Sequence, residues 1–340
     1  WCEESGLVQL NHSFEPSEMY GTNYGYRSGL NNSMVQHLKF KIERIISLNI
    51  LNKDDVVLDI GSNDGTLLSF YKNLGVKKYG MDPTAGKFKK YYDADIKIIE
   101  DFFSKDSFLR ISKNKKAKVV TSIAMFYDLE DPSKFVSDIN DILDEDGIWH
   151  FEQSYLPTML RMNSYDTVCH EHIEYYTLNV VNELLKKNDL KIINVELNAV
   201  NGGSFAVTAA KKNSSLSANN EIVNWLIEKE KRMNLNTLQP YQEFEKRVFQ
   251  HKKDLRDLIK SIKASGKNIA GYGASTKGNV LLQFCELTNK EISCIAEINK
   301  EKFGSFTPGT NIPIMSEEEV KKTKPDYMLV LPWHFRDTII

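Results

Sequence analysis

A short glycine-containing stretch after the first apolar run has the residue types of a cofactor-binding loop. It reads Asp59-Ile60-Gly61-Ser62-Asn63-Asp64-Gly65. The two glycines let a ligand approach the backbone without a Cβ in the way, and the N–H groups of a following helix could bind it. Asp59 and Asp64 disfavour a pyrophosphate, and the spacing is not the G-x-G-x-x-G of dinucleotide sites. The stretch therefore predicts a site for cationic S-adenosylmethionine, with Asp59 accepting from its ammonium group.

Further cofactor contacts are expected where the next strands end. An acidic residue about 20 positions after such a loop commonly binds ribose hydroxyls, and Asp82 has this spacing. Asp101 and Phe102 could bind the adenine edge and cover its face, and Met125 could form a wall of the site. Phe102, Met125 and Phe126 could equally be ordinary core. The predicted cofactor-binding residues are Asp59, Gly61, Ser62, Asn63, Gly65, Asp82, Pro83, Asp101, Phe102, Ala124, Met125 and Phe126.

A second group of reactive side chains follows the fifth apolar run. Two of the seven histidines, His170 and His172, flank Glu171, and Glu174 comes shortly after. A histidine beside a carboxylate can act as a general base near neutral pH. The loop also follows the carboxyl end of a predicted parallel strand, where open α/β sheets bind ligands. Metal ligation by His170, His172 and Glu174 and partly buried, hydrogen-bonded histidines remain as alternatives.

A third glycine-containing loop, from Gly271 to Asn279, could bind a phosphorylated substrate. Backbone N–H groups at a helix start and the Lys277 ammonium suit a diphosphate. The glycine spacing does not favour a nicotinamide cofactor. A tight turn that packs strand on helix is the alternative interpretation. Trp333 and His334 follow a later strand and could line the same site or serve in packing.

Alternating apolar and helical segments must position these side chains. Runs typical of buried parallel strands occur at 56–60, 78–81, 96–99, 119–123 and 148–151, with helical stretches between them and a helix over 33–51 before them. A helix near 179–188, a strand at 191–197, a turn at 201–203 and a returning strand at 204–210 follow. The pattern predicts a doubly wound α/β sheet. Seven strands with a terminal antiparallel pair match the class I methyltransferase fold.

Four segments are predicted along the chain. Residues 1–35 form loops with a short strand at 6–10, and residues 36–212 form the methyltransferase domain. Residues 213–265 form a helical connector whose charges make a solvated face. Residues 266–340 form a small Rossmann-like α/β domain with strands at 269–272, 292–295 and 327–331. Because the chain begins without Met and ends at 338–340, just inside a further helix, we expect flanking residues in the full protein.

Composition excludes several classes of protein. The net charge of −2 over 340 residues provides no basic field for nucleic acid or an anionic membrane. No apolar run approaches the roughly 20 residues of a membrane span, and no signal-peptide pattern is present. The four cysteines are widely spread, and a chain of this size needs no disulfide framework. We expect a cytoplasmic enzyme that acts on a small molecule. The oligomeric state is not indicated.

Together these motifs resemble the sugar C-methyltransferase family, S-adenosylmethionine-dependent enzymes that place a methyl branch on nucleotide-linked deoxysugars. The resemblance covers nearly the whole chain. The His-Glu-His and Gly-Tyr-Gly-Ala motifs are its most specific parts. The other matching stretches are Gly6–Leu10, Tyr24–Gly29, the cofactor loop, residues 308–314 and Leu331-Pro332-Trp333.

The resemblance implies a zinc-binding N-terminal segment, a methyltransferase domain and a Rossmann-like domain, with the nucleotide-sugar between the last two. It implies proton removal beside a 4-keto group and attack of the resulting enolate on the cofactor methyl. His172 would be the base, with Glu171 its neighbour. The predicted catalytic residues are His172, Glu171, Tyr26, Tyr24 and His170. The predicted substrate-binding residues are Tyr24, Tyr26, Arg27, Glu152, Gly271, Tyr272, Gly273, Ala274, Ser275, Lys277, Gly278, Asn279 and Trp333.

Two departures from the family pattern affect the expected cofactors and acceptor. The zinc segment of the family ends in Cys-x-x-Cys, but here the stretch is Cys2-Glu3-Glu4-Ser5. One cysteine cannot make a structural zinc site, so no metal is expected. Cys169 stands where family members often carry Tyr, so the acceptor or the methylated atom can differ. O- or N-methylation of another small polar acceptor and a non-catalytic nucleotide-sugar-binding relative remain alternatives.

Overall fold

The structure, a computed structural model, describes residues 1–21 and 24–335 and divides into two compact units. The first unit comprises Trp1–Tyr155, Ile173–Asn198 and Ser204–Arg232; the second comprises Leu156–His172, Ala199–Gly203 and Met233–Ile340. Each unit therefore contains segments that are distant in the sequence. The helix expected to begin at 338–340 lies outside the described residues.

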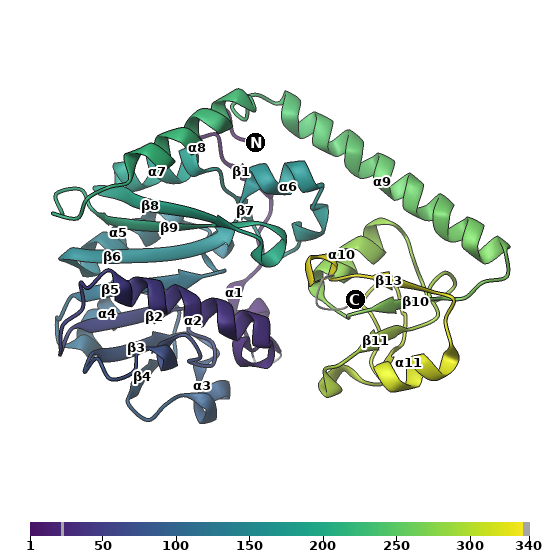
Figure 1. The fold of residues 1–340 in the computed structure, drawn as a ribbon, viewed down its shortest axis with the longest axis horizontal. Helices are drawn as coiled ribbons and strands as arrows, with labels where there is room; N and C mark the ends of the chain where they lie inside the picture. Colours follow the sequence, from purple (N-terminus) through teal and green to yellow (C-terminus); the bar gives the residue numbers. More distant parts are fainter. Residues whose placement is uncertain (22–23, 336–340) are drawn as a thin grey trace. The chain divides into compact units, whose positions relative to one another are not determined.

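A seven-stranded sheet forms the centre of the first unit (Figure 1). The strand order is β4-β3-β2-β5-β6-β9-β8; the first five strands are parallel, and β9 is antiparallel to both neighbours. This order confirms the predicted class I methyltransferase sheet. The strands are β2 (Val56–Ile60), β3 (Lys77–Met81), β4 (Ile96–Ile99), β5 (Ala117–Ile123), β6 (Leu143–Ser154), β8 (Leu190–Asn198) and β9 (Ser204–Lys211).

Helices cover both faces of this sheet, as the alternating pattern predicts. Helix α2 (Asn32–Ser47) packs Leu38, Ile42 and Ile45 on one face, and it crosses the front of the sheet in Figure 1. The opposite face carries the larger core, which includes residues of the remaining long helices. These helices are α4 (Lys105–Ser112), α5 (Pro132–Ile142), α7 (Leu178–Lys187) and α8 (Asn220–Arg232).

The segment after Gly65 differs from the prediction, because no α-helix begins there. Only a 3₁₀ turn forms, at Leu68–Phe70. Asp64 accepts hydrogen bonds from the Thr66 N–H (3.2 Å) and hydroxyl (2.6 Å), a local arrangement that competes with helix formation. Asn73 then adopts a φ of 61°, which ends the segment. The cofactor loop therefore lacks the helix N-terminus expected to supply free N–H groups.

The N-terminal strand is part of the first unit through a long-range pairing. Strand β1 (Val8–Gln9) pairs antiparallel with β7 (Glu174–Tyr175), with Val8 opposite Tyr175. The short elements α1 (Pro16–Met19) and η1 (Ser28–Leu30) follow β1 and precede α2. The sequence predicted the strand at 6–10 but not its partner.

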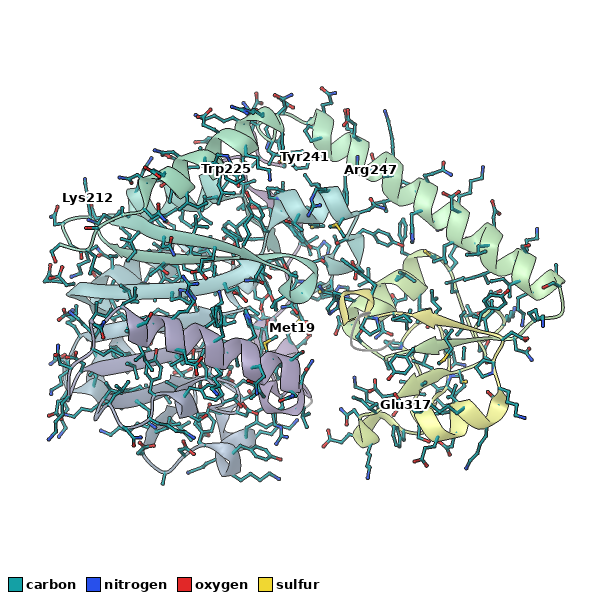
Figure 2. The ribbon with its side chains drawn as sticks, in the orientation of Figure 1. Met19, Lys212, Trp225, Tyr241, Arg247 and Glu317 are labelled. Carbon is teal, nitrogen blue, oxygen red and sulfur yellow. The ribbon has the colours of Figure 1, made fainter. Side chains whose placement is uncertain are left out.

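The second unit contains a four-stranded parallel sheet in the order β12-β11-β10-β13. Its strands are β10 (Ile269–Tyr272), β11 (Ile295–Glu297), β12 (Ile314–Ser316) and β13 (Tyr327–Val330), and its helices are α6 (Leu156–Met162), α9 (Gln239–Ala264), α10 (Thr276–Phe284) and α11 (Glu317–Thr323). The run expected to form β11 was 292–295, but the strand begins only at Ile295. Ile292 and Cys294 are buried ahead of the strand, so their apolar signal reflects burial and not strand pairing. Strand β12 and helix α11, which begins at Glu317 (Figure 2), were not predicted.

The expected connector over residues 213–265 forms two helices that belong to different units. Helix α8 lies in the first unit and α9 in the second. The charges of this segment are not all solvated, because Glu230 of α8 is only 3% exposed. Its carboxylate accepts from the Tyr155 hydroxyl and from the N–H groups of Leu178 and Asn179, so it caps the start of α7. Within the described residues, none of the helices has the length and apolar character to span a membrane.

Candidate functional site

Asp59 lies inside the first unit near the carboxyl end of β2. It is 3% exposed and accepts a hydrogen bond of 2.6 Å from the hydroxyl of Thr121 on β5. Burial raises the pKa of Asp59 to about 7, although the Thr121 bond opposes the shift. Its charged neighbour is Asp82, another anion, which raises the pKa further. A buried carboxylate in this environment would gain stability from an added cation, such as the ammonium of an amino acid.

The loop after β2 requires glycine at two places. Gly61 and Gly65 have φ values of 72° and 77°, which side chains other than that of glycine rarely adopt. A Cβ on Gly65 would lie 2.7 Å from the Tyr92 ring, and one on Gly61 would lie 3.3 Å from Met125 Cγ. The contact with Gly61 places Met125 beside the loop, and its role as a wall of the cofactor site stays a prediction.

Asp82 holds the loop from the end of β3, with Pro83 directly after it. Its carboxylate accepts from the Asn63 N–H at 2.9 Å and from the N–H and hydroxyl of Thr84, each at 2.6 Å. A carboxylate offers about four acceptor positions, so capacity for a ribose hydroxyl remains. The structure thus places Asp59, Asn63 and Asp82 together.

Tyr92 completes the support of the loop, although the sequence did not single it out. Its hydroxyl lies 2.8 Å from Ser62 Oγ and donates to the carbonyl oxygen of Asn63 at 2.8 Å. Its ring also packs against Gly65 and Gly80. No sequence pattern marks a tyrosine 10 positions after Asp82, so only the contact reveals its role.

We expect Tyr92→Phe to weaken S-adenosylmethionine binding by about 5- to 30-fold and to lower the free energy of unfolding by about 1–2 kcal/mol, because two hydrogen bonds to the loop are lost. Calorimetric titration and urea unfolding measure the two effects. Tyr91→Phe is the matched control, since the Tyr91 ring lies 3.9 Å from the Arg27 guanidinium and keeps that contact without its hydroxyl. Equal affinity of Tyr92→Phe and wild type would contradict this role.

The N-terminal segment binds the outer side of the cofactor loop. Ser28 N–H donates to the Asn63 side chain and Gly29 N–H to that of Asp64, both at 2.9 Å. Asn63 Nδ2 in turn donates to the carbonyl of Tyr26 at 3.1 Å. The Tyr26 side chain stays 48% exposed. These contacts place the predicted substrate-lining stretch beside the loop in the first unit.

The other two predicted residues of this stretch make their own contacts. The carbonyl of Tyr24 accepts from Lys87 Nζ at 2.6 Å. The Arg27 guanidinium lies over Tyr91, and its Nε is 3.7 Å from Asp64 Oδ2. The Arg27 charge is therefore already paired with a loop carboxylate.

The remaining cofactor candidates differ in their accessibility. Phe102 is 43% exposed beside the ring of Tyr20, and Asp101 accepts from the Phe102 N–H. Ala124 donates its N–H to the carbonyl of Glu152 at 2.7 Å. Phe126, by contrast, is 1% exposed and stacks on Tyr176 in the core. Phe126 is therefore a residue of the hydrophobic core, which was the alternative to its predicted contact with the cofactor.

Glu152, a predicted substrate-binding residue, is enclosed by protein donors. It is 2% exposed and is bound by His37 Nε2 at 2.6 Å, Lys41 Nζ at 2.9 Å and Asn198 Nδ2 at 2.7 Å. Burial alone would raise its pKa, but the His37 hydrogen bond and the Lys41 charge outweigh burial and lower the pKa of Glu152 to about 2. The carboxylate is thus ionised and already paired.

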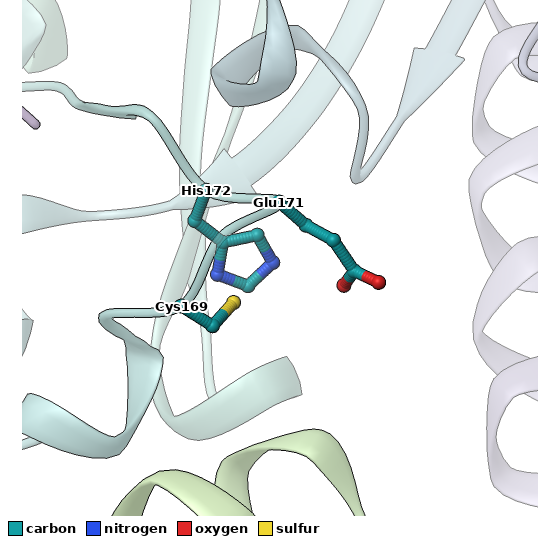
Figure 3. Close-up of side chains that lie close together, drawn as sticks. All are labelled: Cys169, Glu171 and His172. Carbon is teal, nitrogen blue, oxygen red and sulfur yellow. The ribbon is translucent and has the colours of Figure 1, made fainter. Parts of the chain in front are cut away.

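The His-Glu-His loop belongs to the second unit. Figure 3 shows the Cys169 thiol close to the His172 ring, whereas the Glu171 carboxylate extends away from it. His172 Nδ1 is 2.8 Å from the carbonyl oxygen of Thr167. Because a carbonyl only accepts, Nδ1 carries the proton and the neutral ring has its lone pair on Nε2. His170 is exposed on the surface.

Electrostatics keep the His172 ring neutral. Burial lowers the pKa of His172 to about 4, the Thr167 hydrogen bond opposes the shift, and the charge of Lys277 adds to it. Burial also raises the pKa of Glu171, against the opposing charge of His170. At neutral pH the His172 ring can therefore accept a proton at Nε2.

The ligand set proposed for a metal is not the one that the structure gathers. Possible ligand atoms of Cys169, Glu171 and His172 lie within 4.8 Å of one another. Glu174 instead pairs in β7 of the first unit and accepts a hydrogen bond from the Tyr176 hydroxyl. The metal alternative with His170, His172 and Glu174 thus has no geometric support in the described part of the chain.

The glycines of the 271–279 loop are required by packing within the second unit. A Cβ on Gly271, Gly273 or Gly278 would lie 2.3–2.9 Å from a side chain of Ile295, Pro332 or Leu331. Such close contacts agree with the alternative of a turn that packs strand on helix. The neighbours of these glycines are also bound. Tyr272 donates its hydroxyl to Glu317, Ala274 N–H donates to Glu297, Ser275 caps α10, and Asn279 N–H donates to the Ser275 carbonyl.

The Lys277 ammonium, predicted to bind a diphosphate, is hydrogen-bonded to a carbonyl of the protein. Its Nζ is buried and donates to the carbonyl oxygen of Asn201 at 2.6 Å, and burial lowers its pKa. Nearby, Trp333 Nε1 donates to Asp166 Oδ2 at 2.9 Å. These bonds attach the 199–203 turn to α10 and the His-Glu-His segment to the C-terminal end of the unit.

The strand order and the glycine-containing loop with buried Asp59 define an S-adenosylmethionine-dependent methyltransferase. Residues 34–195 match the model of a methyltransferase domain, and residues 199–340 match that of a C-methyltransferase C-terminal domain. C-methyltransferase NovU of Streptomyces niveus is 29% identical over 340 residues, which is all of this chain and 80% of NovU. The chain is thus similar to C-methyltransferases along its whole length, as its motifs indicated.

Solved methyltransferases are more distant. Magnesium protoporphyrin IX methyltransferase of Synechocystis PCC 6803 is 13% identical with a TM-score of 0.41, covering 52% of this chain and 83% of that chain. The plantazolicin methyltransferase BpumL is 13% identical with a TM-score of 0.40, covering 53% and 84%. The fold class rests on the strand order of the sheet itself.

Proposed function

We propose that this C-methyltransferase acts on a nucleotide-activated keto sugar and methylates a carbon beside the keto group through an enolate, with His172 as the base. The observation that carries the proposal is the orientation of His172. The Thr167 carbonyl holds its Nδ1 proton, so the neutral ring has a lone pair at Nε2. A carbon acceptor must lose a proton before it can attack a methyl group, and a neutral imidazole can take that proton.

The residues of the first unit suit S-adenosylmethionine. Bound there, the cofactor supplies an electrophilic methyl group on a sulfonium. Buried Asp59 provides a carboxylate for its ammonium, and Asp82 has acceptor capacity for its ribose hydroxyls. The Tyr92 hydroxyl, bonded to Ser62 and to the Asn63 carbonyl, supports the loop conformation in which Gly61 and Gly65 have positive φ values.

The nucleotide part of the proposal rests on the second unit and on the family resemblance. Helix α10 begins at Thr276, with three residues between it and the end of β10, as at phosphate sites of Rossmann-like folds. Because Ser275 Oγ accepts from the Gly278 N–H, the N–H groups of Thr276 and Lys277 are the donors proposed for a diphosphate. Because Lys277 Nζ is engaged by Asn201, we assign the diphosphate contact to the backbone of this loop rather than to the lysine. Tyr24, Tyr26 and Trp333 remain proposed substrate-lining residues.

A panel of nucleotide-linked sugars with and without a 4-keto group tests the proposal. We expect a mass increase of one methyl group for a keto sugar only, and NMR should locate the methyl on a carbon beside the former carbonyl. In deuterated water without cofactor, the C–H proton at that carbon should exchange. Methylation of an oxygen or nitrogen, or turnover confined to acceptors that lack a nucleotide, would overturn the proposal.

A further inference from the structure

The first unit contains a second histidine–carboxylate pair, His37 with Glu152, in addition to the proposed base. His37 Nε2 and Glu152 Oε1 are 2.6 Å apart. Glu152 is ionised, with a pKa of about 2, so Nε2 must carry a proton that it donates to the carboxylate. The other ring nitrogen, Nδ1, makes no hydrogen bond to any other residue in 1–21 and 24–335.

His37 differs in exposure from the charged residues around it. Its side chain is 12% exposed, whereas the side chains of Lys41 and Glu152 are each 3% exposed. The buried pair therefore orients a ring that solvent can still reach. This is the arrangement by which a carboxylate fixes the orientation and tautomer of an acid–base histidine and stabilises its protonated form.

A chain of hydrogen bonds and packing contacts connects this pair to the predicted cofactor loop within the first unit. Glu152 lies opposite Ile123, the last residue of β5, at the carboxyl edge of the sheet. Its carbonyl binds the N–H of Ala124, and the next residue, Met125, packs against Gly61. His37 lies in the first half of α2, which begins two residues after the η1 turn that binds Asn63 and Asp64. Open α/β sheets bind their ligands at this edge.

The charged side chains around His37 balance one another while its ring is neutral. From α2, Lys41 and Arg44 contribute positive charges; from β6 and β8, Glu152 and Glu196 contribute negative ones. His150 on β6 is neutral, because burial lowers its pKa to about 3. Asn198 is uncharged. A protonated His37 would therefore give the cluster one more positive than negative charge.

We infer that His37, held by Glu152, is the group that stabilises the negative charge developing on the acceptor oxygen during methyl transfer. With both ring nitrogens protonated, Nδ1–H donates a hydrogen bond to the carbonyl oxygen that becomes the enolate oxygen. The carbon-bound proton goes to the base, the carbon forms its bond to the methyl group, and the electrons of the carbon–sulfur bond remain on sulfur. Glu152 is a positioning residue that acts through His37. The inference deepens the proposed function and rests on its enolate step.

The central experiment is His37→Gln, since glutamine can still donate to Glu152 but carries no ionisable ring. We expect kcat on the keto acceptor to fall about 10²- to 10³-fold, the usual effect of removing one oxyanion donor, while the Kd for S-adenosylmethionine stays within about twofold. His150→Gln is the matched control. His150 lies on β6, the strand that carries Glu152, and is 6% exposed. Its Nδ1 is 2.9 Å from Thr208 Oγ1, and its enclosed Nε2 has no hydrogen-bond partner among the described residues. It should affect unfolding but not kcat.

Two readouts separate this role from a purely structural one. The loss in His37→Gln should fall on kcat, with the KM for the keto acceptor within about twofold of the wild-type value, because the oxygen carries the developing charge only in the transition state. Added imidazole at mildly acidic pH should restore part of the rate to His37→Ala. Equal kcat for His37→Gln and wild type, or losses that His150→Gln reproduces, would overturn the inference.

The outcomes distinguish this inference from the proposed function. A normal rate in His37→Gln with an inactive His172→Ala would remove only the His37 assignment. If the accepted keto substrate carried no nucleotide and His37→Gln still lost most of its kcat on it, only the nucleotide part of the proposed function would be wrong. An acceptor without a carbonyl beside the methylated atom would overturn both.

Discussion

His172→Ala is expected to lower the rate of methyl transfer by about 10²- to 10⁴-fold, the usual contribution of a general base, and to leave S-adenosylmethionine affinity unchanged. The reason is local to the second unit. The Thr167 carbonyl fixes the proton on Nδ1, so Nε2 is the atom that can accept the substrate proton. Single-turnover rates and calorimetric Kd values, measured on the same preparation, separate the two effects.

The acidic side of the pH profile provides a second test of His172. Because burial lowers the pKa of His172 to about 4, the ring stays neutral well below its usual range, and the rate should be independent of this group above about pH 5. The unfolded chain takes up this proton near pH 6.5, so stability should fall as pH drops from about 6.5 to 4. His172→Ala should remove that part of the pH dependence.

His251→Ala is a suitable control for the His172 substitution. His251 lies in the same unit and contacts the Tyr165 hydroxyl at 3.0 Å, but it is not part of the proposed acid–base groups. We expect a modest loss of stability with near-normal turnover. If His172→Ala retained wild-type turnover, the base assignment would be wrong, whereas the cofactor assignment would stand.

Asp59→Asn should reduce S-adenosylmethionine binding below detection by calorimetry and yet stabilise the protein without cofactor at pH 8. Asparagine keeps the shape and can still accept from Thr121, but it provides no charge for the cofactor ammonium. The expected loss of affinity is at least 10²-fold. Wild-type affinity in Asp59→Asn would overturn the proposed cofactor contact.

The stabilisation follows from the raised pKa of Asp59. A carboxyl with a pKa of about 7 in the folded protein and 3.8 in the unfolded chain favours folding when protonated, so its contribution is lost as pH rises from about 4 to 7. At pH 8 the buried charge costs up to roughly 4 kcal/mol, at 1.36 kcal/mol per pKa unit. Urea unfolding of wild type and Asp59→Asn at pH 5 and pH 8 measures this difference, which should be large only at pH 8.

The substitution Asp54→Asn controls for a general effect of removing an aspartate from this region. Asp54 lies just before β2 on the surface, and its ion pair with Lys77 is exposed. Exposed pairs contribute little to stability, so neither cofactor affinity nor the pH dependence of unfolding should change appreciably. An equal gain in stability from Asp54→Asn would mean that burial of Asp59 is not the cause.

The sequence by itself determined the parallel strands, the glycine-containing loop after β2 and the similarity to C-methyltransferases. Strand β2 matches its predicted range because five consecutive buried residues give a local apolar signal. The special backbone positions at 61 and 65 can also be recognised from the sequence, because glycine is the residue that readily adopts their positive φ values. The helix expected after Gly65 was wrong because Asp64 binds Thr66 locally, a competition that apolar spacing does not reveal.

Only the tertiary structure decided which unit each functional segment joins and what each polar group binds. The His-Glu-His loop and the 199–203 turn join the second unit through Asp166–Trp333 and Asn201–Lys277, hydrogen bonds that span 167 and 76 residues. Lys277 and Glu152 looked like substrate contacts because their residue types suit ligands, but each is engaged by protein partners. Such long-range pairings depend on the packed fold, so spacing along the chain could predict the reactive groups but not their partners.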